Sequence, residues 1–387
     1  MSTDATPRLI YLDHNATTPL DPAVLAAMMP YLNERFGNAS SYHTAGRLAR
    51  AAMEHARAQV ATFLGATPAE VIFTGSGTEA DNLALRGVAA ATGRRGRHLV
   101  IGATEHPAVL RTAADLAADG WEVTCLPVDG EGRVDPAAVR QALRADTVLV
   151  SVMAANNETG VIQPVAEIAA LAHAAGALMH TDAVQAAGKM PLQVDCLGVD
   201  LLSLAGHKVY GPKGTGALYV REGTPLRAGL TGGPQESGRR AGTENVAGVV
   251  GLGAALAAAT AGDQPHVAGL RQRLVDGVQA CLDGVQVHSA RAPRLGNTAS
   301  LSFAGVDGEA VLLHLDLAGI AAATGSACSS ESAEPSHVLL AMGVPPRLAR
   351  GTVRFSLGRG NTAAEIDATI AALAQGVPRL RALGAGL

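Results

Sequence analysis

The stretch Asp200-Leu-Leu-Ser-Leu-Ala-Gly-His-Lys208 contains the pattern that decides the fold, a short apolar run that ends in glycine, histidine and lysine. Comparable apolar runs lie at 70–74, 98–102, 147–153, 177–181 and 216–220. Stretches of helical character separate most of them, at 78–91, 107–118, 136–143 and 165–175. Continuous apolar strands that alternate with helices are typical of a parallel sheet covered on both faces. We therefore predict an α/β fold built on a mostly parallel sheet.

The pattern changes after about residue 243, which indicates a second, smaller α+β domain. Gly376 and Pro378 are expected to end the last helix of the chain. We assign residues 16–261 to the large domain, and residues 1–15 and 262–387 to the small one. The predicted elements of the second half are helices at 244–261, 266–282, 308–317, 336–341 and 363–375, and strands at 285–288, 298–303 and 353–357.

The composition limits the classes of protein to which the chain can belong. Hydrophobic residues make up 48% of its 387 residues, so a large core can form. A net charge of −4 argues against a general nucleic-acid-binding surface, which usually needs a basic patch. No apolar run reaches the roughly 18 residues of a membrane span, and the first residues lack the features of a signal peptide. We expect a cytoplasmic protein that contacts neither membranes nor nucleic acids directly.

Lysine is scarce, because only three of the 30 basic residues are lysine. Arginine keeps its proton near neutral pH, so chemistry that needs a neutral primary amine must use one of these three. Lys208 directly follows a buried strand, where the loss of water favours the neutral amine. Lys213 lies in a glycine-proline turn and Lys189 follows a helix-like segment, so both are expected to be exposed. Lys208 is therefore the candidate amine.

A glycine-rich turn follows the strand at 70–74, with the sequence Gly75-Ser-Gly-Thr-Glu-Ala80. Glycines let the backbone approach an anion, and the start of the next helix supplies free N–H groups. Gly77 and Thr78 are therefore candidate phosphate ligands. Two other interpretations stay open, since the spacing also fits a dinucleotide-binding fingerprint and a plain turn.

Polar residues also follow the strands at 98–102 and 147–153, in the position where ligands bind to sheets of this kind. His106 precedes a helix, and it suits either a general acid–base or stacking group, or a capping residue. Asn156, Asn157 and Glu158 suit hydrogen bonds to a ligand, but they also suit a turn, which is the default interpretation.

Asp182 follows the strand at 177–181, where a buried acid is costly unless it is paired. A protonated pyridine nitrogen would be a suitable partner. The alternative is a metal site that uses His180, Asp182 and His207, since imidazole and carboxylate groups bind zinc or iron.

The four cysteines differ in their surroundings. Cys125 ends a strand-like run and Cys281 lies on a predicted helix, so both are expected to be buried or half-buried, and Cys196 can be similar. Cys328 lies among glycine, serine and other small polar residues, which predicts an exposed, mobile loop. No pair of cysteines forms a C-x-x-C motif.

Phosphate donors, a histidine, an acid and a lysine at the ends of successive strands are together the set that pyridoxal 5′-phosphate (PLP) requires. The most specific motifs are Gly37-Asn-Ala-Ser-Ser41, Asn156-Asn-Glu-Thr-Gly160, Arg239-Arg-Ala-Gly-Thr-Glu-Asn245, and Gly325-Ser-Ala-Cys328 followed by Glu334-Pro-Ser-His337. With these motifs the chain resembles the NifS/IscS-like cysteine desulfurases, which are fold-type I PLP enzymes of the class V aminotransferase family. The resemblance extends from Tyr11 to Arg359.

The resemblance implies a large PLP-binding domain and a small domain that carries a catalytic cysteine loop. Lys208 would form the covalent link to PLP, Cys328 would be the nucleophile, and His106 would stack on the ring and move protons. Arg354 would bind the substrate carboxylate, with Asn157 nearby. The implied cofactor-binding residues are Gly77, Thr78, His106, Asn157, Asp182, Gln185, His207, Lys208 and Thr243.

Several of these implied contacts are specific. Asp182 would pair with the pyridine nitrogen, and Gln185 would bond the phenolic oxygen. Thr78 and His207 would contact the phosphate, and Thr243 would reach it from the partner subunit of a homodimer. The family usually has serine where this chain has Ala205, so we expect PLP to be held more weakly here.

The implied reaction takes sulfur from L-cysteine, releases L-alanine and leaves a persulfide on Cys328. A protein acceptor such as an iron–sulfur scaffold would then receive the sulfur, and a cluster can form at Cys328. Acceptors in tRNA thiolation or DNA phosphorothioation are equally compatible with this chemistry. The alternatives are another fold-type I PLP aminotransferase, a selenocysteine lyase, or a non-catalytic scaffold that keeps the fold.

Overall fold

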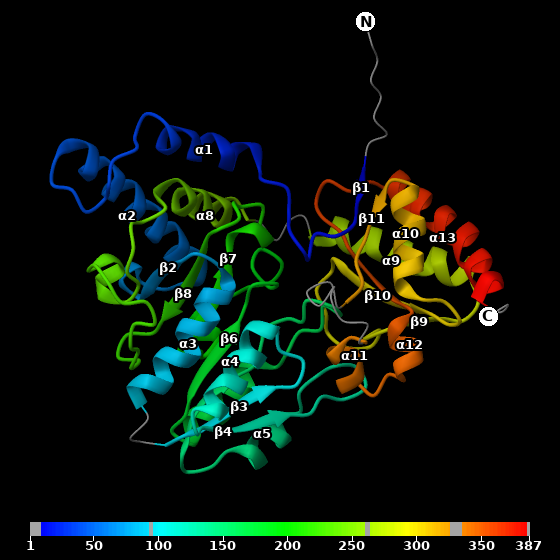
Figure 1. Ribbon diagram of the computed structural model, residues 1–387, viewed down its shortest axis with the longest axis horizontal. Helices are drawn as coiled ribbons and strands as arrows, with labels where there is room; N and C mark the ends of the chain where they lie inside the picture. Colours follow the sequence, from blue (N-terminus) through cyan, green and yellow to red (C-terminus); the bar gives the residue numbers. More distant parts are fainter. Residues whose placement is uncertain (1–8, 93–95, 260–263, 326–334, 385–387) are drawn as a thin grey trace, which may run out of the picture.

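The computed structural model describes residues 9–92, 96–259, 264–325 and 335–384. A seven-stranded sheet of order β2-β8-β7-β6-β5-β3-β4 lies at the centre of its larger part (Figure 1). β8 runs antiparallel to both of its neighbours, and the other described strand pairs of this sheet are parallel. The predicted α/β fold with a mostly parallel sheet is therefore confirmed. The strands are β2 (Val71–Thr74), β3 (His98–Gly102), β4 (Glu122–Leu126), β5 (Thr147–Ser151), β6 (Leu178–Asp182), β7 (Leu201–Ala205) and β8 (Gly216–Val220).

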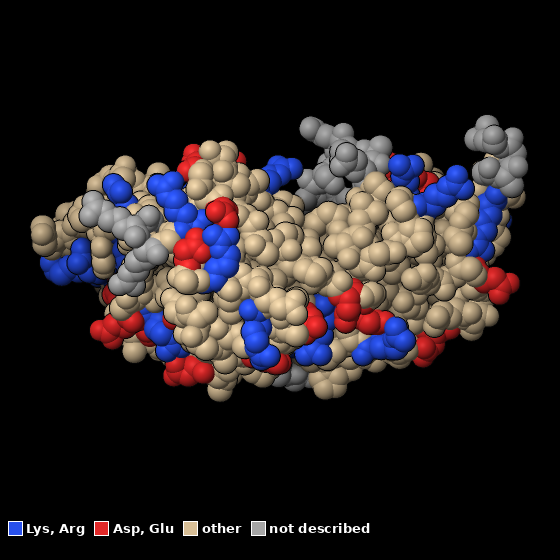
Figure 2. All heavy atoms as spheres, turned by 90° about the horizontal axis from the view of Figure 1, so that it is seen from below, with Lys and Arg blue, Asp and Glu red and all other residues tan. Residues whose placement is uncertain are grey.

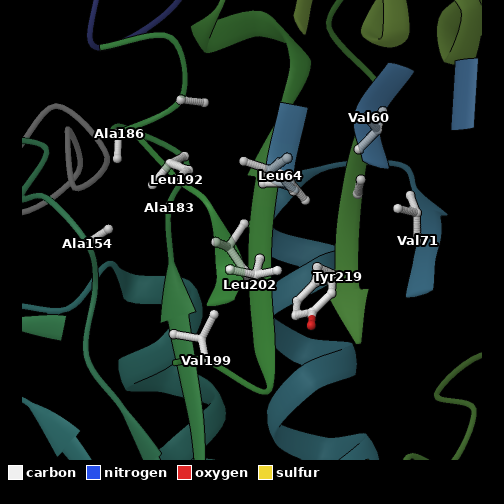
Figure 3. Close-up of a cluster of buried hydrophobic side chains, with 14 of the residues drawn as sticks. Val60, Leu64, Val71, Ala154, Ala183, Ala186, Leu192, Val199, Leu202 and Tyr219 are labelled. Carbon is white, nitrogen blue, oxygen red and sulfur yellow. The ribbon is translucent and has the colours of Figure 1, made fainter. Parts of the chain in front are cut away.

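Both faces of this sheet are buried, which explains why its strands are apolar along their whole length. Leu202 of β7 and Tyr219 of β8 pack in one core with Val60 and Leu64 of α2 (Figure 3). Leu201, the neighbour of Leu202, lies in the core on the opposite face, which α3 and α4 cover. The helices of this part are α1 (Pro22–Leu32), α2 (Thr44–Leu64), α3 (Gly77–Thr92), α4 (Pro107–Ala118), α5 (Pro136–Ala142), α6 (Val165–Ala174), α7 (Val194–Leu197) and α8 (Val246–Ala258).

A smaller body with its own core follows (Figure 1). It has an antiparallel sheet of order β12-β10-β9 and a parallel pair, β1 with β11. Leu12, next to β1, is buried in this core. The domain boundaries stay a prediction, and residues 260–263 lie outside the described residues. The elements are β1 (Ile10–Tyr11), α9 (Gln264–Cys281), β9 (Val285–Val287), β10 (Thr298–Phe303), α10 (Gly308–Leu317), β11 (Ile320–Ala321), α11 (His337–Ala341), α12 (Pro346–Arg350), β12 (Thr352–Ser356) and α13 (Ala363–Gly384).

The predicted end of the last helix is wrong, because α13 continues through Gly376 and Pro378 to Gly384. Val377, which lies between these two residues, is fully buried in the small core, so packing maintains the helix there. Gly376 has a packing role, since a Cβ at this position would lie 2.2 Å from Cδ2 of His314. Within the described ranges, no helix has the length and apolar character needed to cross a membrane.

Candidate active site

The candidate site lies at the carboxyl ends of β6 and β7. Asp182 is the last residue of β6, and its buried Oδ1 accepts a hydrogen bond from the backbone N–H of Val184 at 2.9 Å. Burial raises the pKa of Asp182, while His106 and Lys208 act in the opposite direction. A buried acid beside His106 and Lys208 suits a cation such as a protonated pyridine nitrogen.

Lys208 ends a short 3-10 helix, Gly206–Lys208, which directly follows β7. Its Nζ donates to the carbonyl oxygens of Asn15 at 2.5 Å and Ala16 at 2.8 Å. Burial and the positive charges of Lys208 and Lys213 lower the pKa of His207 to about 4. His207 is therefore neutral near pH 7, and it can donate one N–H to a phosphate oxygen.

His106 is the N-cap of α4, so the capping interpretation holds. Its Nδ1 accepts a hydrogen bond from the backbone N–H of Ala108 at 3.1 Å. Burial lowers the pKa of His106; Asp182 opposes this change, and Lys208 adds to it. A neutral ring whose Nδ1 accepts must carry its proton on Nε2, so Nε2 is the atom that can donate to a ligand.

The start of α3 forms a cradle against the ends of β6 and β7. A Cβ at Gly77 would lie 2.7 Å from Cγ2 of Val184 and 3.4 Å from Cβ of Ala205, so this close approach requires glycine. The first N–H groups of a helix have no intrahelical acceptor, and Thr78 beside them is exposed. The cradle therefore suits an anion such as the phosphate of PLP, and the buried Asp182 suits its pyridine nitrogen.

Arg354 of β12 approaches the same region from the small body. Nη2 donates to Oδ1 of Asp13 at 2.8 Å, and Nη1 donates to the carbonyl oxygen of Asn157 at 3.1 Å. The side chain is 4% exposed, and its buried Nε has no hydrogen-bond partner among the described residues. A guanidinium held on one side with a donor left over suits a substrate carboxylate.

Glu158 lies beside both described ends of the segment that carries Cys328, and it is bonded to one of them. Oγ of Ser336 donates to Oε2 of Glu158 at 2.5 Å. On the other side, a Cβ at Gly325 would lie 2.2 Å from the same oxygen. Cys328 itself lies outside the described residues. The segment therefore begins and ends beside Asn157, the neighbour of Glu158.

The sequence predicted that Lys189 is exposed, and this prediction is wrong. Its side chain is half-buried, close enough to Lys208 to be affected by its charge. The chain after β6 turns back on itself, with the backbone N–H of Lys189 bonded to the carbonyl of Ala186, and this turn carries Nζ to Gln185. Lys213 is exposed, as expected. Thr243 is also exposed, in the segment before α8, so its predicted contact with the cofactor stays a prediction that needs a second subunit.

The structure does not support the metal alternative. Both ring nitrogens of His180 are bonded to hydroxyls, Nδ1 to Ser151 at 2.8 Å and Nε2 to Ser203 at 3.0 Å. Across the part of the chain that the structure describes, no three His, Cys, Asp or Glu residues are grouped so as to hold a metal ion. The carboxylate of Asp81 is buried and lies 3.6 Å from Nε2 of His180. Nothing in the sequence around Asp81 indicated this position.

The cysteines at positions 125, 196 and 281 are exposed, so the expected burial is wrong. Cys125 lies on β4, an edge strand that is paired on one side only. Cys281 is the last residue of α9, and Cys196 lies on the short helix α7.

The comparisons with known proteins identify the family of the chain. The model of the aminotransferase class-V family matches residues 10–369. The chain is 47% identical over 379 residues to the cysteine desulfurase IscS of Dictyoglomus turgidum, which covers 97% of this chain and 96% of that protein. It is 46% identical over 377 residues to the cysteine desulfurase IscS of Methanosarcina thermophila, with 97% and 93% covered.

A solved structure described as a NifS-like protein superposes on the chain with a TM-score of 0.90 at 38% identity, and 96% of this chain and 100% of that chain are covered. PLP is the cofactor of this family, and the residues at the ends of β6 and β7 fit it. The chain therefore belongs to the class-V aminotransferase family, as a cysteine desulfurase that uses PLP.

Proposed function

We propose that Lys208, Asp182 and Arg354 form the site at which L-cysteine loses its sulfur, and that Cys328 takes that sulfur. The observation that carries this proposal is that Gly325 and Ser336, on either side of the Cys328 segment, both lie against Glu158, to which Ser336 is bonded. Glu158 is adjacent to Asn157, whose carbonyl holds Arg354. A cysteine on this segment is therefore within reach of a substrate whose carboxylate binds Arg354.

PLP, when bound, supplies an electron sink for bond changes at the substrate carbons. Around it, Asp182 would keep a proton on the pyridine nitrogen, and the start of α3 with Thr78 and His207 would hold the phosphate. Lys208 would move the proton of the substrate Cα, and the carbonyls of Asn15 and Ala16, which hold its Nζ at the end of β7, support this role.

Sulfur transfer then needs a thiolate on Cys328. The thiolate attacks the substrate sulfur, and the new S–S bond forms as the Cβ–S bond breaks. The electron pair of the broken bond stays on Cβ, which gains a proton and becomes the methyl group of L-alanine. Nε2 of His106, which carries a proton, is the nearby donor that the structure supports for such steps.

Exchanging Cys328 tests this assignment. Cys328→Ala should abolish release of sulfide from L-cysteine while PLP binding, measured by visible absorbance, stays normal. Cys281→Ala is the matched control, since it removes an exposed thiol at the end of α9 and should leave the rate unchanged. If Cys328→Ala keeps its activity, the persulfide mechanism is wrong for this chain, and a lyase mechanism without a cysteine nucleophile takes its place.

A homodimer is the second part of the proposal. Large apolar side chains are exposed along α1 and up to the start of α2, including Phe36 at 78% and Tyr42 at 93%. Such a surface marks an interaction site, and a second copy bound there would bring the partner subunit's Thr243 to the phosphate. Sedimentation equilibrium of the Phe36→Asp variant should show monomers where the wild type shows dimers. A wild type that remains monomeric at micromolar concentration would contradict the proposal.

The acceptor of the sulfur is proposed to be a protein, such as an iron–sulfur scaffold, in the cytoplasm. Acidic and basic side chains are mixed on the face drawn in Figure 2, and no extended basic patch for nucleic acid is visible there. A reducing compartment would also keep the exposed cysteines as thiols. Incubation with radiolabelled L-cysteine, followed by scaffold protein or tRNA, should move the label to the protein. Direct transfer to tRNA alone would refute this choice.

A further inference from the structure

A chain of hydrogen bonds connects two of the three lysines of the protein. Nζ of Lys189 donates to the carbonyl oxygen of Gln185 at 3.0 Å and to its side-chain Oε1 at 3.3 Å. Nε2 of Gln185 donates to the carbonyl oxygen of Asn15 at 3.0 Å. The same carbonyl accepts from Nζ of Lys208 at 2.5 Å. Lys189 therefore reaches the amine of the site through one amide and one carbonyl.

This arrangement determines which way the amide of Gln185 is turned. An amide can exchange its oxygen and nitrogen by a flip, and its hydrogen-bond partners decide between the two orientations. Lys189 provides only donors when charged, and the carbonyl of Asn15 can only accept. Both partners require the same orientation, with Oε1 toward Lys189 and Nε2 toward the side of Asn15 and Lys208.

We propose that Lys189 is a positioning residue, which holds the amide of Gln185 so that Nε2 is presented as a donor to the phenolic oxygen of PLP. The proposal rests on the contact between Gln185 and PLP that the resemblance implies. Without Lys189, a flipped amide would place an oxygen against that phenolic oxygen, and two acceptors would face each other.

The surroundings of Lys189 make a purely structural role a poor explanation. Its side chain is half-buried and lines a cavity that Lys208 also lines. Burial lowers the pKa of Lys189 to about 7, and the positive charges of Lys208 and Arg354 act in the same direction. An apolar side chain of similar length would avoid this cost. The other titratable groups close to it are His14, which is affected by its charge, and Asp21, Tyr210 and Arg359, which line the same cavity.

The test is the pH titration of the visible absorbance of the PLP-loaded enzyme. A donor to the phenolic oxygen and a nearby positive charge both favour the less positive form of the linkage at Lys208, so their loss raises the midpoint. Lys189→Met should raise the midpoint by about one pH unit and weaken PLP binding to the apoprotein about tenfold. Lys213→Met removes the same charge from an exposed turn and should change neither, while Lys189→Arg should restore most of both.

The Gln185→Ala background separates the possible failures. If Gln185→Ala changes neither midpoint nor PLP affinity, the implied contact of Gln185 with PLP is wrong. If Gln185→Ala shifts the midpoint and Lys189→Met does not, the positioning role of Lys189 is refuted while Gln185 keeps its role. An equal effect of Lys189→Met in both backgrounds would mean that the lysine acts by charge alone, which also overturns positioning. Lys189→Ala provides the same comparison if the methionine variant does not fold.

Discussion

The Arg354→Lys variant tests how the site recognises its substrate. Arg354 is held by Asp13 and by the carbonyl of Asn157 through its two terminal nitrogens, and the N–H groups that these two bonds leave over are available for a carboxylate. A lysine has the charge but a single nitrogen, so it cannot keep both protein contacts and also bind the substrate in the planar geometry of arginine. One charge-assisted hydrogen bond contributes about 1.5–3 kcal/mol. We therefore expect kcat/KM for L-cysteine to fall about 10- to 150-fold.

Two measurements separate this effect from damage to the fold. PLP binding to the apoprotein should be unchanged, because the cradle at α3 and Asp182 lie elsewhere in the site. The affinity for cysteamine, which has the amine and the thiol but no carboxylate, should be the same in wild type and Arg354→Lys. An L-cysteine KM within twofold of wild type would refute the carboxylate assignment. An equal loss for L-cysteine and cysteamine would show that the site itself has been distorted.

Three further predictions concern the cofactor cradle and the buried histidine. Gly77→Ala forces a Cβ to 2.7 Å from Val184, so it should cost about 1–3 kcal/mol of unfolding free energy and weaken PLP binding, whereas Gly269→Ala, with nothing within 4 Å, should not. Apoprotein titration should show that Ala205→Ser binds PLP more tightly than wild type, and weaker binding would disprove a missing phosphate hydroxyl. Burial lowers the pKa of His180 to about 3, so its contribution to stability is complete above about pH 6.5 and is lost as the pH falls toward 3. Urea unfolding of His180→Gln should therefore depend less on pH between 6 and 4, by about 1.4 kcal/mol per unit.

The fold was predictable because both faces of the main sheet are buried. Leu201 and Leu202 pack in cores on opposite faces of the sheet, so consecutive residues of a strand are both apolar. The polar residue that follows such a run indicates where the strand ends. The end of α13 was not predictable from glycine and proline alone. Burial of Val377 and the close approach of His314 to Gly376 depend on the packing of α10 against α13, which no local pattern reveals.

The site was predictable wherever a residue lies at or just beyond the carboxyl end of a strand, as Asp182 and Lys208 do. Contacts between distant segments could not be inferred in this way. Glu158 bonds Ser336 across 178 positions, and Asn15 meets Lys208 across 193. The turn after β6 lies between these two cases. Gln185 and Lys189 are four residues apart, so their contact is local in the sequence although neither residue is at a strand end.

The chain has only three lysines, and position after a strand identified only one of the two that lie at the site. Position after an apolar strand selects Lys208 because the carboxyl end of that strand carries it to the site, where it meets Asn15 and Ala16. The same rule discards Lys189, whose burial comes from a turn that folds back toward Asn15. In a chain that otherwise uses arginine for its positive charges, Lys189 is a half-buried lysine beside the site, and its amine donates to both oxygens of Gln185. Two of the three lysines thus belong to one hydrogen-bonded unit, and the exposed Lys213 is the natural reference against which both can be measured.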